Sequence, residues 1–259
     1  MPHGKHRREV NIAETRFDQH ARIWNVSIVQ TLETESSTIG FGTSAGRPVV
    51  LKVIRNQSDE WRSGAVLDAL AGNGAVRVYE YADGAALLER LSPATPLVEL
   101  SLAGRDDEAT EILCDVMRRL WQSDRTASAV AIQDWGAGFN RYLESGDRQL
   151  PRDLLLQARS AFMQLAATQK NEVLLHGDLQ HYNVLHDEKR GWLAIDPKGV
   201  IGEREYEVGA ALRNPIQQFD RFAPPAVIER RIQRVQSGLE LDAERMLSWS
   251  FAQGVLSAV

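Results

Sequence analysis

The sequence predicts an α+β protein of two lobes: an antiparallel sheet with one helix in residues 1–91, and a mainly helical lobe in residues 92–259. Three observations predict this fold. The first third of the chain alternates β-rich runs with turns, and the remainder carries apolar residues at helical spacing. Between them, two prolines within residues 92–96 are expected to stop regular structure.

The predicted N-terminal lobe is organised around an apolar run at 49–54 that only Lys52 interrupts. Small residues at 36–42 predict a loop before it, and Ser58 is positioned to cap the helix after it. The turn Asp83-Gly84 predicts a hairpin. We expect strands at 22–31, 49–54, 75–81 and 85–91, and a helix at 59–70.

The predicted C-terminal lobe is mostly helical. We expect helices at 108–122, 134–145, 152–168, 206–213, 226–237 and from 242 to the end, with short strands near 174–175, 184–185 and 192–195. Residues 246–259 show no capping glycine or polar stop, so we expect a helix still in progress and a truncated lobe.

Composition narrows the class of protein. A hydrophobic content of 43% and a charged content of 25% are ordinary for a soluble protein, and no apolar run approaches the ~18 residues needed to cross a bilayer. The basic residues 1–8 lead into no apolar segment, so we expect a tail rather than a secretory signal. The single cysteine, Cys114, lies in a helical apolar stripe, which predicts a packing role and fits a reducing cytoplasm.

The net charge of −5 arises wholly in residues 92–259, because residues 1–91 carry equal numbers of acidic and basic side chains. Nucleic acid is therefore not expected as a partner, since phosphate binding calls for a basic surface. A small cationic substrate would suit this charge. We expect a monomer or a weak dimer.

The chemistry of the chain is concentrated in residues 174–184. They place His176, Asp178 and Asn183 in one short loop, and an apolar run after it ends on Asp196. Asp-x4-Asn followed by Asn-x12-Asp suits phosphoryl transfer. One carboxylate accepts the proton of an attacking hydroxyl, and the other two side chains hold magnesium against the phosphates. We expect Asp178 to be the base, Asn183 and Asp196 the Mg²⁺ ligands, and His176 a support for the loop.

A lysine inside an apolar strand needs either solvent or an anionic partner. With the acidic loop downstream, Lys52 is predicted to contact nucleotide phosphates and to pair with Glu60, with Asp59 as the competing acid. The loop at 36–42 would cover the phosphates. The predicted nucleotide contacts are Gly40 and Gly42 in that loop, and Glu89 and Leu91 at a hinge that would hold adenine through backbone groups.

Three other kinds of site were weighed. A metal site of His176, His181, His186 and Asp178 lacks the spacings of zinc motifs. Cys114 has no support as a nucleophile, because it lies in an apolar stripe. A serine triad would need a Gly-x-Ser-x-Gly turn, which the sequence lacks.

The motifs His-Gly-Asp-x4-Asn at 176–183 and Ile-Asp-Pro at 195–197 resemble those of the aminoglycoside phosphotransferases, a branch of the protein-kinase-like fold. The longer segments 175–184, 191–203 and 73–79 are similar to the streptomycin 6-phosphotransferase and hydroxyurea phosphotransferase group. The resemblance implies the same roles for Asp178, Asn183, Asp196 and Lys52. Because Phe-Gly does not follow Asp196, it also implies constitutive activity.

The resemblance implies an ATP- and Mg²⁺-dependent O-phosphotransferase for an aminoglycoside, with streptomycin first. Hydroxyurea or another small metabolite is the alternative acceptor, and a nucleotide-binding protein with little turnover is the alternative of another class. Because streptomycin carries guanidinium groups, Glu203 is a candidate substrate contact. Glu207 is expected to be mainly structural, since acids are favoured at the start of a helix.

Overall fold

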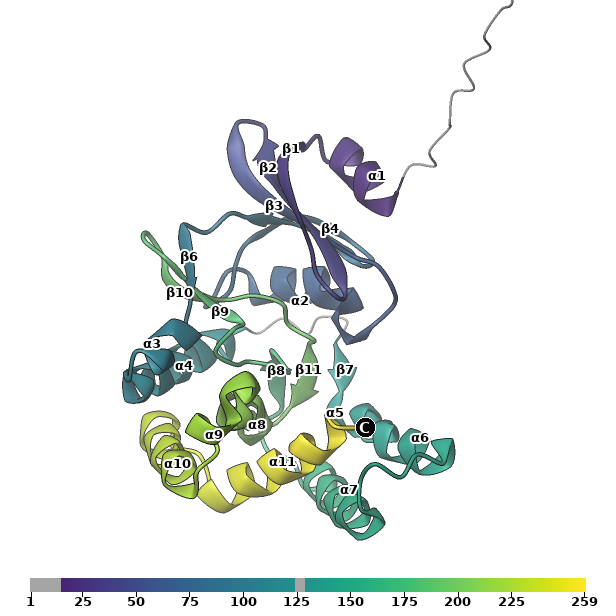
Figure 1. Cartoon of the computed structure of the whole chain (residues 1–259), viewed down its shortest axis with the longest axis vertical. Coiled ribbons are helices and arrows are strands. Elements are labelled where there is room, and N and C mark those ends of the chain that lie inside the picture. Colours follow the sequence, from purple (N-terminus) through teal and green to yellow (C-terminus); the bar gives the residue numbers. More distant parts are fainter. Residues whose placement is uncertain (1–14, 124–128) are drawn as a thin grey trace, which may run out of the picture.

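A computed structural model describes residues 15–123 and 129–259. The upper lobe in Figure 1 is a sheet and the lower lobe is mainly helical, which confirms the predicted α+β fold. Along the five-stranded antiparallel sheet, the order is β1 (Ser27–Glu33), β2 (Ser37–Ser44), β3 (Arg47–Ile54), β5 (Ala85–Glu89) and β4 (Val78–Ala82). The basic segment 1–8 lies outside the described residues.

A helix that the sequence pattern did not reveal, α1 (Arg16–Ile23), begins the described chain. Its cap is reciprocal: the Thr15 hydroxyl accepts the Asp18 N–H at 3.1 Å, and the Asp18 carboxylate accepts the Thr15 N–H at 3.2 Å. This cap draws the first residues of the predicted strand at 22–31 into the helix. Strand β1 therefore starts only at Ser27.

The helix predicted at 59–70 is divided into a 3-10 turn, η1 (Asp59–Arg62), and α2 (Ser63–Leu70). The Ser58 side chain makes no capping hydrogen bond, so the predicted cap is wrong. The division has a consequence for the site, because η1 carries Glu60 to the side chain of Lys52.

Two prolines led us to expect a break in regular structure at residues 92–96, and this prediction is wrong. These residues contain β6 (Pro93–Pro96), which pairs with β9 (Val184–Asp187), and β9 pairs in turn with β10 (Gly191–Ala194). The prolines are tolerated because β6 is an edge strand with a bulge, where missing N–H groups remove no ladder bond.

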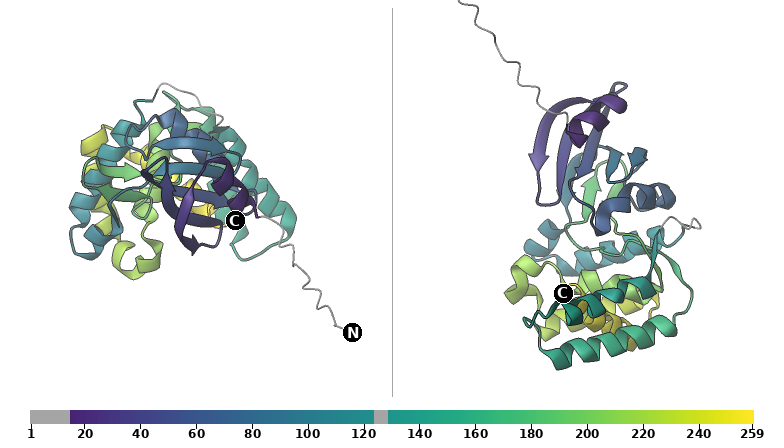
Figure 2. Two further views of the ribbon diagram at one scale, coloured as in Figure 1. Left: turned by 90° about the horizontal axis from the view of Figure 1, so that it is seen from above. Right: turned by 90° about the vertical axis from the view of Figure 1, so that its right-hand side faces the viewer.

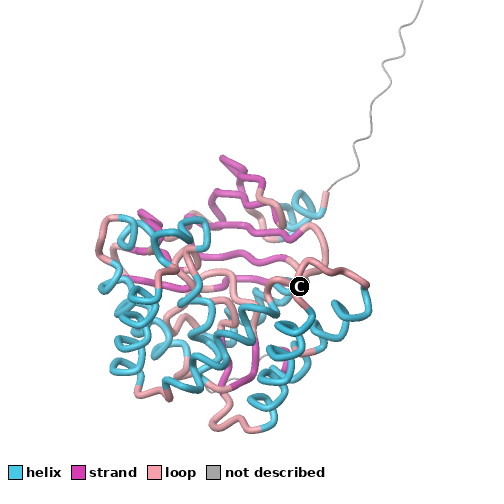
Figure 3. The backbone as a smooth tube through the Cα atoms, turned by 60° about the horizontal axis from the view of Figure 1, so that its bottom comes forward, coloured by secondary structure: helices cyan, strands magenta, loops and turns pink. Residues whose placement is uncertain are grey.

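The lower lobe is mainly helical (Figures 2 and 3), and aromatic rings pack together between its helices. The Phe162 ring meets Trp249 edge-on at 5.2 Å, and Trp249 meets Tyr206 edge-on at 5.2 Å. The helices are α3 (Val98–Leu102), α4 (Asp106–Leu120), α5 (Ile132–Trp135), α6 (Ala137–Ser145), α7 (Arg152–Ala167), α8 (Arg204–Arg213), α9 (Phe219–Phe222), α10 (Pro225–Leu239) and α11 (Ala243–Leu256), with a 3-10 turn η2 (Ile216–Gln218).

Two predictions about these helices are refined. The helix expected at 134–145 is divided between α5 and α6 at Gly136. Any larger residue at position 136 would place a Cβ 2.9 Å from the Phe162 ring. The helix expected to run to the end of the chain instead ends at Leu256. Cys114 is buried within α4, and burial raises the pKa of its thiol to about 11, as its packing role requires.

Short strands frame the acidic loop. A small sheet contains β7 (Val130–Ala131), β11 (Val200–Gly202) and β8 (Val173–Leu175). Residues 176–183, which we call the catalytic-type loop, connect β8 to the β9–β10 hairpin. No helix in the described part of the chain has the length and apolar character needed to cross a membrane.

The two lobes are joined by hydrogen bonds as well as by the chain. The guanidinium of Arg190, beside β10, binds the Glu89 carboxylate and donates to the Gly72 carbonyl at 2.8 Å. The Ala194 N–H donates to the Gly74 carbonyl at 2.8 Å, and its own carbonyl accepts from the Val76 N–H at 2.9 Å. The cleft between the lobes therefore has a fixed back wall.

Candidate active site

Strand β3 carries Lys52 into the interface between the lobes, where this residue is 6% exposed. Its Nζ lies 2.8 Å from Glu60 Oε2 and 2.8 Å from Asp196 Oδ1. Burial alone would lower the pKa of Lys52, but the two carboxylates outweigh burial and hold that pKa above its ordinary value. Glu60 is thus the pairing acid, while Asp59 lies 3.6 Å from Lys198 instead. Lys52 is a fixed cation.

The catalytic-type loop is held by a buried carboxylate on α8. Glu207 accepts the backbone N–H of His176 at 2.7 Å and that of Gly177 at 2.9 Å. Burial raises the pKa of Glu207 to about 7, against the lowering effect of those N–H groups. Gly177 has φ +84°, and a Cβ there would lie 2.9 Å from Val200, so the loop needs glycine at this position.

His176 supports the loop from within, as its sequence context predicted. Its Nε2 lies 2.8 Å from the Ile195 carbonyl, and its Nδ1 is 3.3 Å from the Asp178 nitrogen. Burial lowers the pKa of His176 to about 4, so the ring is neutral. A neutral ring with its proton on Nε2 donates to Ile195 and accepts from Asp178, which accounts for both contacts.

Asn183 and Asp196 are brought together by backbone pairing. The Asn183 side-chain Nδ2 donates to the Asp178 carbonyl at 2.9 Å, and the Ile195 N–H donates to the Asn183 carbonyl at 2.9 Å. Asp196 has φ +57°, a left-handed conformation that few residues other than glycine adopt. One amide oxygen and one carboxylate form the hard oxygen set that Mg²⁺ prefers, so these residues fit that ion.

The histidines weighed as zinc ligands have other surroundings. His181 is fully buried, and the His186 ring packs on Trp192 at 4.9 Å. Within residues 15–123 and 129–259, no group of three or more His, Cys, Asp and Glu side chains is arranged to hold a metal.

A mainly apolar pocket of about 380 Å³ lies between the lobes; we call it the interlobe pocket. Lys52 and Asp196 belong to its lining, as do the predicted hinge residues Glu89 and Leu91. The remaining walls are Ile39, Phe41, Val50, Val76, Leu88, Arg90, Pro93, Ala94, Leu185 and Ile195. An apolar slot beside a fixed lysine suits a flat heterocycle with a phosphate chain.

The predicted loop at 36–42 is wrong, because these residues belong mostly to strand β2. Side chains alternate along a strand, so Ile39 and Phe41 face the interlobe pocket while Gly40 and Gly42 face away from it. A Cβ on Gly40 would lie 2.5 Å from the Phe17 ring, and one on Gly42 would lie 2.2 Å from a backbone oxygen of β1. We therefore reassign the two glycines to packing against α1 and β1.

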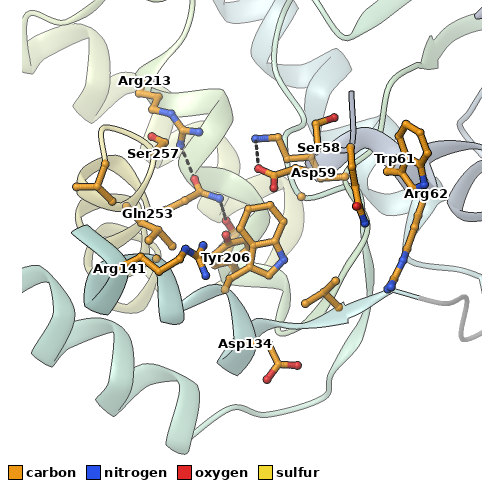
Figure 4. Close-up of a pocket in the computed structure, with 18 residues that line it drawn as sticks. Ser58, Asp59, Trp61, Arg62, Asp134, Arg141, Tyr206, Arg213, Gln253 and Ser257 are labelled. Carbon is orange, nitrogen blue, oxygen red and sulfur yellow. Dashed lines mark hydrogen bonds and ion pairs between the residues drawn. The ribbon is translucent and has the colours of Figure 1, made fainter. Parts of the chain in front are cut away.

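A second cavity, of about 400 Å³, lies beside the catalytic-type loop; we call it the loop cavity (Figure 4). Its lining includes Ser58, Asp59, Trp61, Arg62, Asp134, Trp135, Arg141, Gly177, Lys198, Tyr206, Arg213 and Gln253. Arg213 Nη2 is 3.7 Å from Asp178 Oδ1, so the cavity leads to the predicted base. Its lining carries two carboxylates, of Asp59 and Asp134, and four cationic side chains, of Arg62, Arg141, Lys198 and Arg213.

The structure gives Glu203 another role than substrate binding. This residue is 1% exposed, and its carboxylate is held by Arg245 Nε at 2.5 Å, by the Trp249 indole and by the Lys170 N–H at 3.1 Å. This carboxylate ties α11 to the start of α8 and to the segment that follows α7. We therefore reassign Glu203 to the structure of the lobe.

Sequence reasoning missed two residues at this site, Arg213 and Gln253, and it missed the loop-holding contacts of Glu207. A signal existed for Glu207, because it is a lone acid inside the apolar run 206–212. No signal existed for Arg213, which ends a helix where a basic residue is ordinarily favoured.

Known proteins resemble this chain over most of its length. Residues 22–259 match the family described as aminoglycoside/hydroxyurea antibiotic resistance kinase. The streptomycin 3''-kinase of Klebsiella pneumoniae is 36% identical over 88% of this chain and 85% of that protein. The streptomycin 6-kinase of Streptomyces griseus is 28% identical over 72% of this chain and 62% of that protein. The structure of aminoglycoside phosphotransferase APH(4)-Ia with ADP and hygromycin B is similar at a TM-score of 0.56 and 17% identity, covering 94% of this chain and 97% of that one.

Proposed function

The chain belongs to the aminoglycoside/hydroxyurea antibiotic resistance kinase family and is a small-molecule kinase, and we propose that it transfers the γ-phosphoryl group of ATP to a hydroxyl of streptomycin. One observation carries this proposal. Lys52 and Asp196 line the apolar interlobe pocket, and Arg213, which lines the charged loop cavity, lies 3.7 Å from Asp178. Nucleotide and acceptor could then meet beside one carboxylate.

We assign the steps to these residues as follows. The interlobe pocket holds the adenine between Ile39, Leu91 and Leu185, and Lys52 pairs with the phosphates. Asn183 and Asp196 would hold Mg²⁺, which when bound neutralises charge on the phosphates. Asp178 accepts the proton of the acceptor hydroxyl as its oxygen attacks phosphorus.

In the loop cavity, the exposed carboxylate of Asp134 and the aromatic face of Trp135 suit a guanidinium group. Lys198 already pairs with Asp59 at 3.6 Å and lies 5.6 Å from the centre of the Trp135 ring, so a cationic acceptor would take the place of this lysine. The relative with 36% identity is named a streptomycin 3''-kinase, whereas two relatives named streptomycin 6-kinase are 28% and 24% identical. We therefore propose the 3'' hydroxyl of streptomycin as the acceptor group.

The test is acceptor-dependent ADP release followed by analysis of the product. With streptomycin and Mg²⁺, we expect ADP release, a product heavier by one phosphoryl group and a phosphorus signal coupled to the 3'' position. Asp178→Ala should abolish turnover while ATP still binds. ADP release that streptomycin does not stimulate would contradict the proposed acceptor.

Hydroxyurea is the second candidate acceptor, because the matching family is described by both substrates. In the same assay, hydroxyurea would have to stimulate ADP release at a higher kcat/KM than streptomycin does. If neither compound stimulates release although ATP binds, the chain is a nucleotide-binding protein with little turnover.

We further propose that the protein works in the cytoplasm, where ATP is supplied, and as a monomer or weak dimer. The single cysteine is buried and so requires no oxidising compartment. Light scattering during size-exclusion chromatography measures the oligomeric state directly.

A further inference from the structure

The C-terminal helix α11 is connected to the predicted catalytic base through two side chains. Gln253 of α11 accepts a hydrogen bond from Arg213 Nη1 at 2.5 Å. The other terminal nitrogen of that guanidinium, Nη2, lies 3.7 Å from Asp178 Oδ1. Figure 4 shows Arg213 and Gln253 joined in this way at one wall of the loop cavity.

The distance between Arg213 and Asp178 determines what kind of contact this is. At 3.7 Å the charges attract, but the atoms are too far apart for a hydrogen bond. The Asp178 carboxylate is thereby held in place while it keeps its capacity to accept a proton from a hydroxyl. A guanidinium suits this role, because its planar fork fixes the second nitrogen once the first is bonded.

Gln253 is itself held firmly. It is 3% exposed, and its Nε2 lies 3.5 Å from the Tyr206 carbonyl of α8. Helix α8 allows this approach only because residue 209 is glycine: a Cβ there would lie 2.2 Å from Gln253 Oε1. The path from α11 to Asp178 therefore begins at a buried, closely packed glutamine and continues through Arg213 and Asp178, whose side chains are 25% and 28% exposed.

We infer that Arg213 is a positioning residue for Asp178 and that Gln253 fixes Arg213, which makes helix α11 part of the machinery for phosphoryl transfer. This inference rests on the proposed function, since it takes Asp178 as the base. It adds that the base is aimed by an element about 75 residues further along the chain, where Gln253 lies.

The first test uses Arg213→Ala with and without added guanidinium ion. We expect kcat to fall roughly 10- to 100-fold, because a small misplacement of a catalytic group has effects of this size. The KM for ATP should stay within about twofold, since the interlobe pocket is lined by other residues. Millimolar guanidinium should restore part of kcat in Arg213→Ala and leave the wild-type rate unchanged.

The second test uses Gln253→Leu, which keeps the size of the side chain and removes its acceptor. We expect kcat to fall about 3- to 10-fold, as for the net contribution of one typical hydrogen bond, with no rescue by guanidinium. Ser250→Ala is the matched control, because this hydroxyl, one turn earlier on α11, bonds only to Met246 of its own helix. It should keep the wild-type kcat.

Two results would overturn the inference: an unchanged kcat in Arg213→Ala, or a loss of kcat that guanidinium does not restore in a variant whose melting temperature has also dropped. Both kcat measurements use an acceptor that the wild-type protein phosphorylates and that Asp178→Ala does not. A wild-type protein inactive on every acceptor would instead contradict the proposed function.

Discussion

The interlobe pocket, which Asp196 lines, and the loop cavity, which lies beside the catalytic-type loop, are built differently. The interlobe pocket is apolar, and much of its wall comes from three neighbouring strands of the sheet. The loop cavity is charged, and its wall comes from η1, from α5 and α6, and from α8 and α11. The proposed nucleotide side is thus formed largely by the sheet, and the proposed acceptor side largely by helices that pack together. Changes on the first side should affect every acceptor, and changes on the second should be selective.

The largest effect is expected from Lys52→Met, on the nucleotide side. It leaves Glu60 and Asp196 without their shared cation, so kcat should fall roughly 100- to 1000-fold for any acceptor. Steady-state kinetics with two different acceptors measures this. Arg47→Met, an exposed position of the same strand, should change neither kcat nor KM. If kcat of Lys52→Met fell for only one of the two acceptors, the two pockets could no longer be distinguished in this way.

Glu207→Gln tests the carboxylate that holds the catalytic-type loop, on which both the nucleotide and the acceptor depend in the proposed reaction. An amide can accept only one of the two loop N–H groups and turns its NH₂ toward the other, so kcat should fall about tenfold. Glu205→Gln, a neighbour on α8 with a partly exposed side chain, is the control. An equal loss of kcat in both variants would show that Glu207 does not hold the loop.

The same carboxyl gives a pH dependence of stability. The folded-state pKa of Glu207, about 7, lies above its ordinary value of 4.5. Its contribution to the free energy of unfolding is therefore fully present below pH 4.5 and is lost as pH rises through 7. This amounts to about 3 kcal/mol. Urea unfolding between pH 5 and 8 should show this decline in the wild type and not in Glu207→Gln.

A smaller effect, on stability alone, is expected from Gly40→Ala. The new Cβ would meet the Phe17 ring at 2.5 Å on the side of β2 that faces away from the interlobe pocket. We expect a loss of about 1–3 kcal/mol in the free energy of unfolding, with the KM for ATP unchanged. Thermal unfolding and ATP titration measure the two quantities. Thr43→Ala, at an exposed position of the same strand, should alter neither, and a raised KM in Gly40→Ala would return this glycine to the nucleotide site.

The smallest effect is expected from Asp134→Asn in the loop cavity. Since this carboxylate is exposed, its pairing with a guanidinium contributes about 0.2–1 kcal/mol, so the KM for streptomycin should rise no more than about fivefold. The KM for ATP should not change. Asp153→Asn on α7, an exposed acid outside the cavity, is the control. Equal changes in both variants would indicate a general charge effect.

The same difference between the two sides explains how much the sequence could predict. Spacing within one loop predicted Asp178 and Asn183 as site residues, and the position of a lysine in an apolar strand predicted Lys52. Each of these signals lies within one short segment of the chain. The apolar spacings that predicted most of the helices are also of this kind. Gly40 was misread because a small residue in a loop and a small residue under an aromatic ring look alike in sequence.

The acceptor side was harder to predict because its residues meet only after the lobe has packed. Glu203 looked available for a cationic substrate, and only the structure shows Arg245 and Trp249 bound to it. Arg213 and Gln253 are far apart in the chain, and neither belongs to a motif. The strand at Pro93–Pro96 was missed for a related reason, because an edge position becomes apparent only when the neighbouring strand is known.

The back wall of the cleft has a kinetic consequence. Arg190 binds Glu89 and the Gly72 carbonyl, and the backbone of Ala194 pairs with Gly74 and Val76, so hydrogen bonds tie the two lobes together along this edge. Wide opening would require these bonds to break together, whereas ADP could leave through the front of the cleft with all of them intact. The rate of ADP release should therefore depend little on solvent viscosity. Arg190→Ala, which removes the hydrogen bonds of this side chain between the lobes, should increase that dependence.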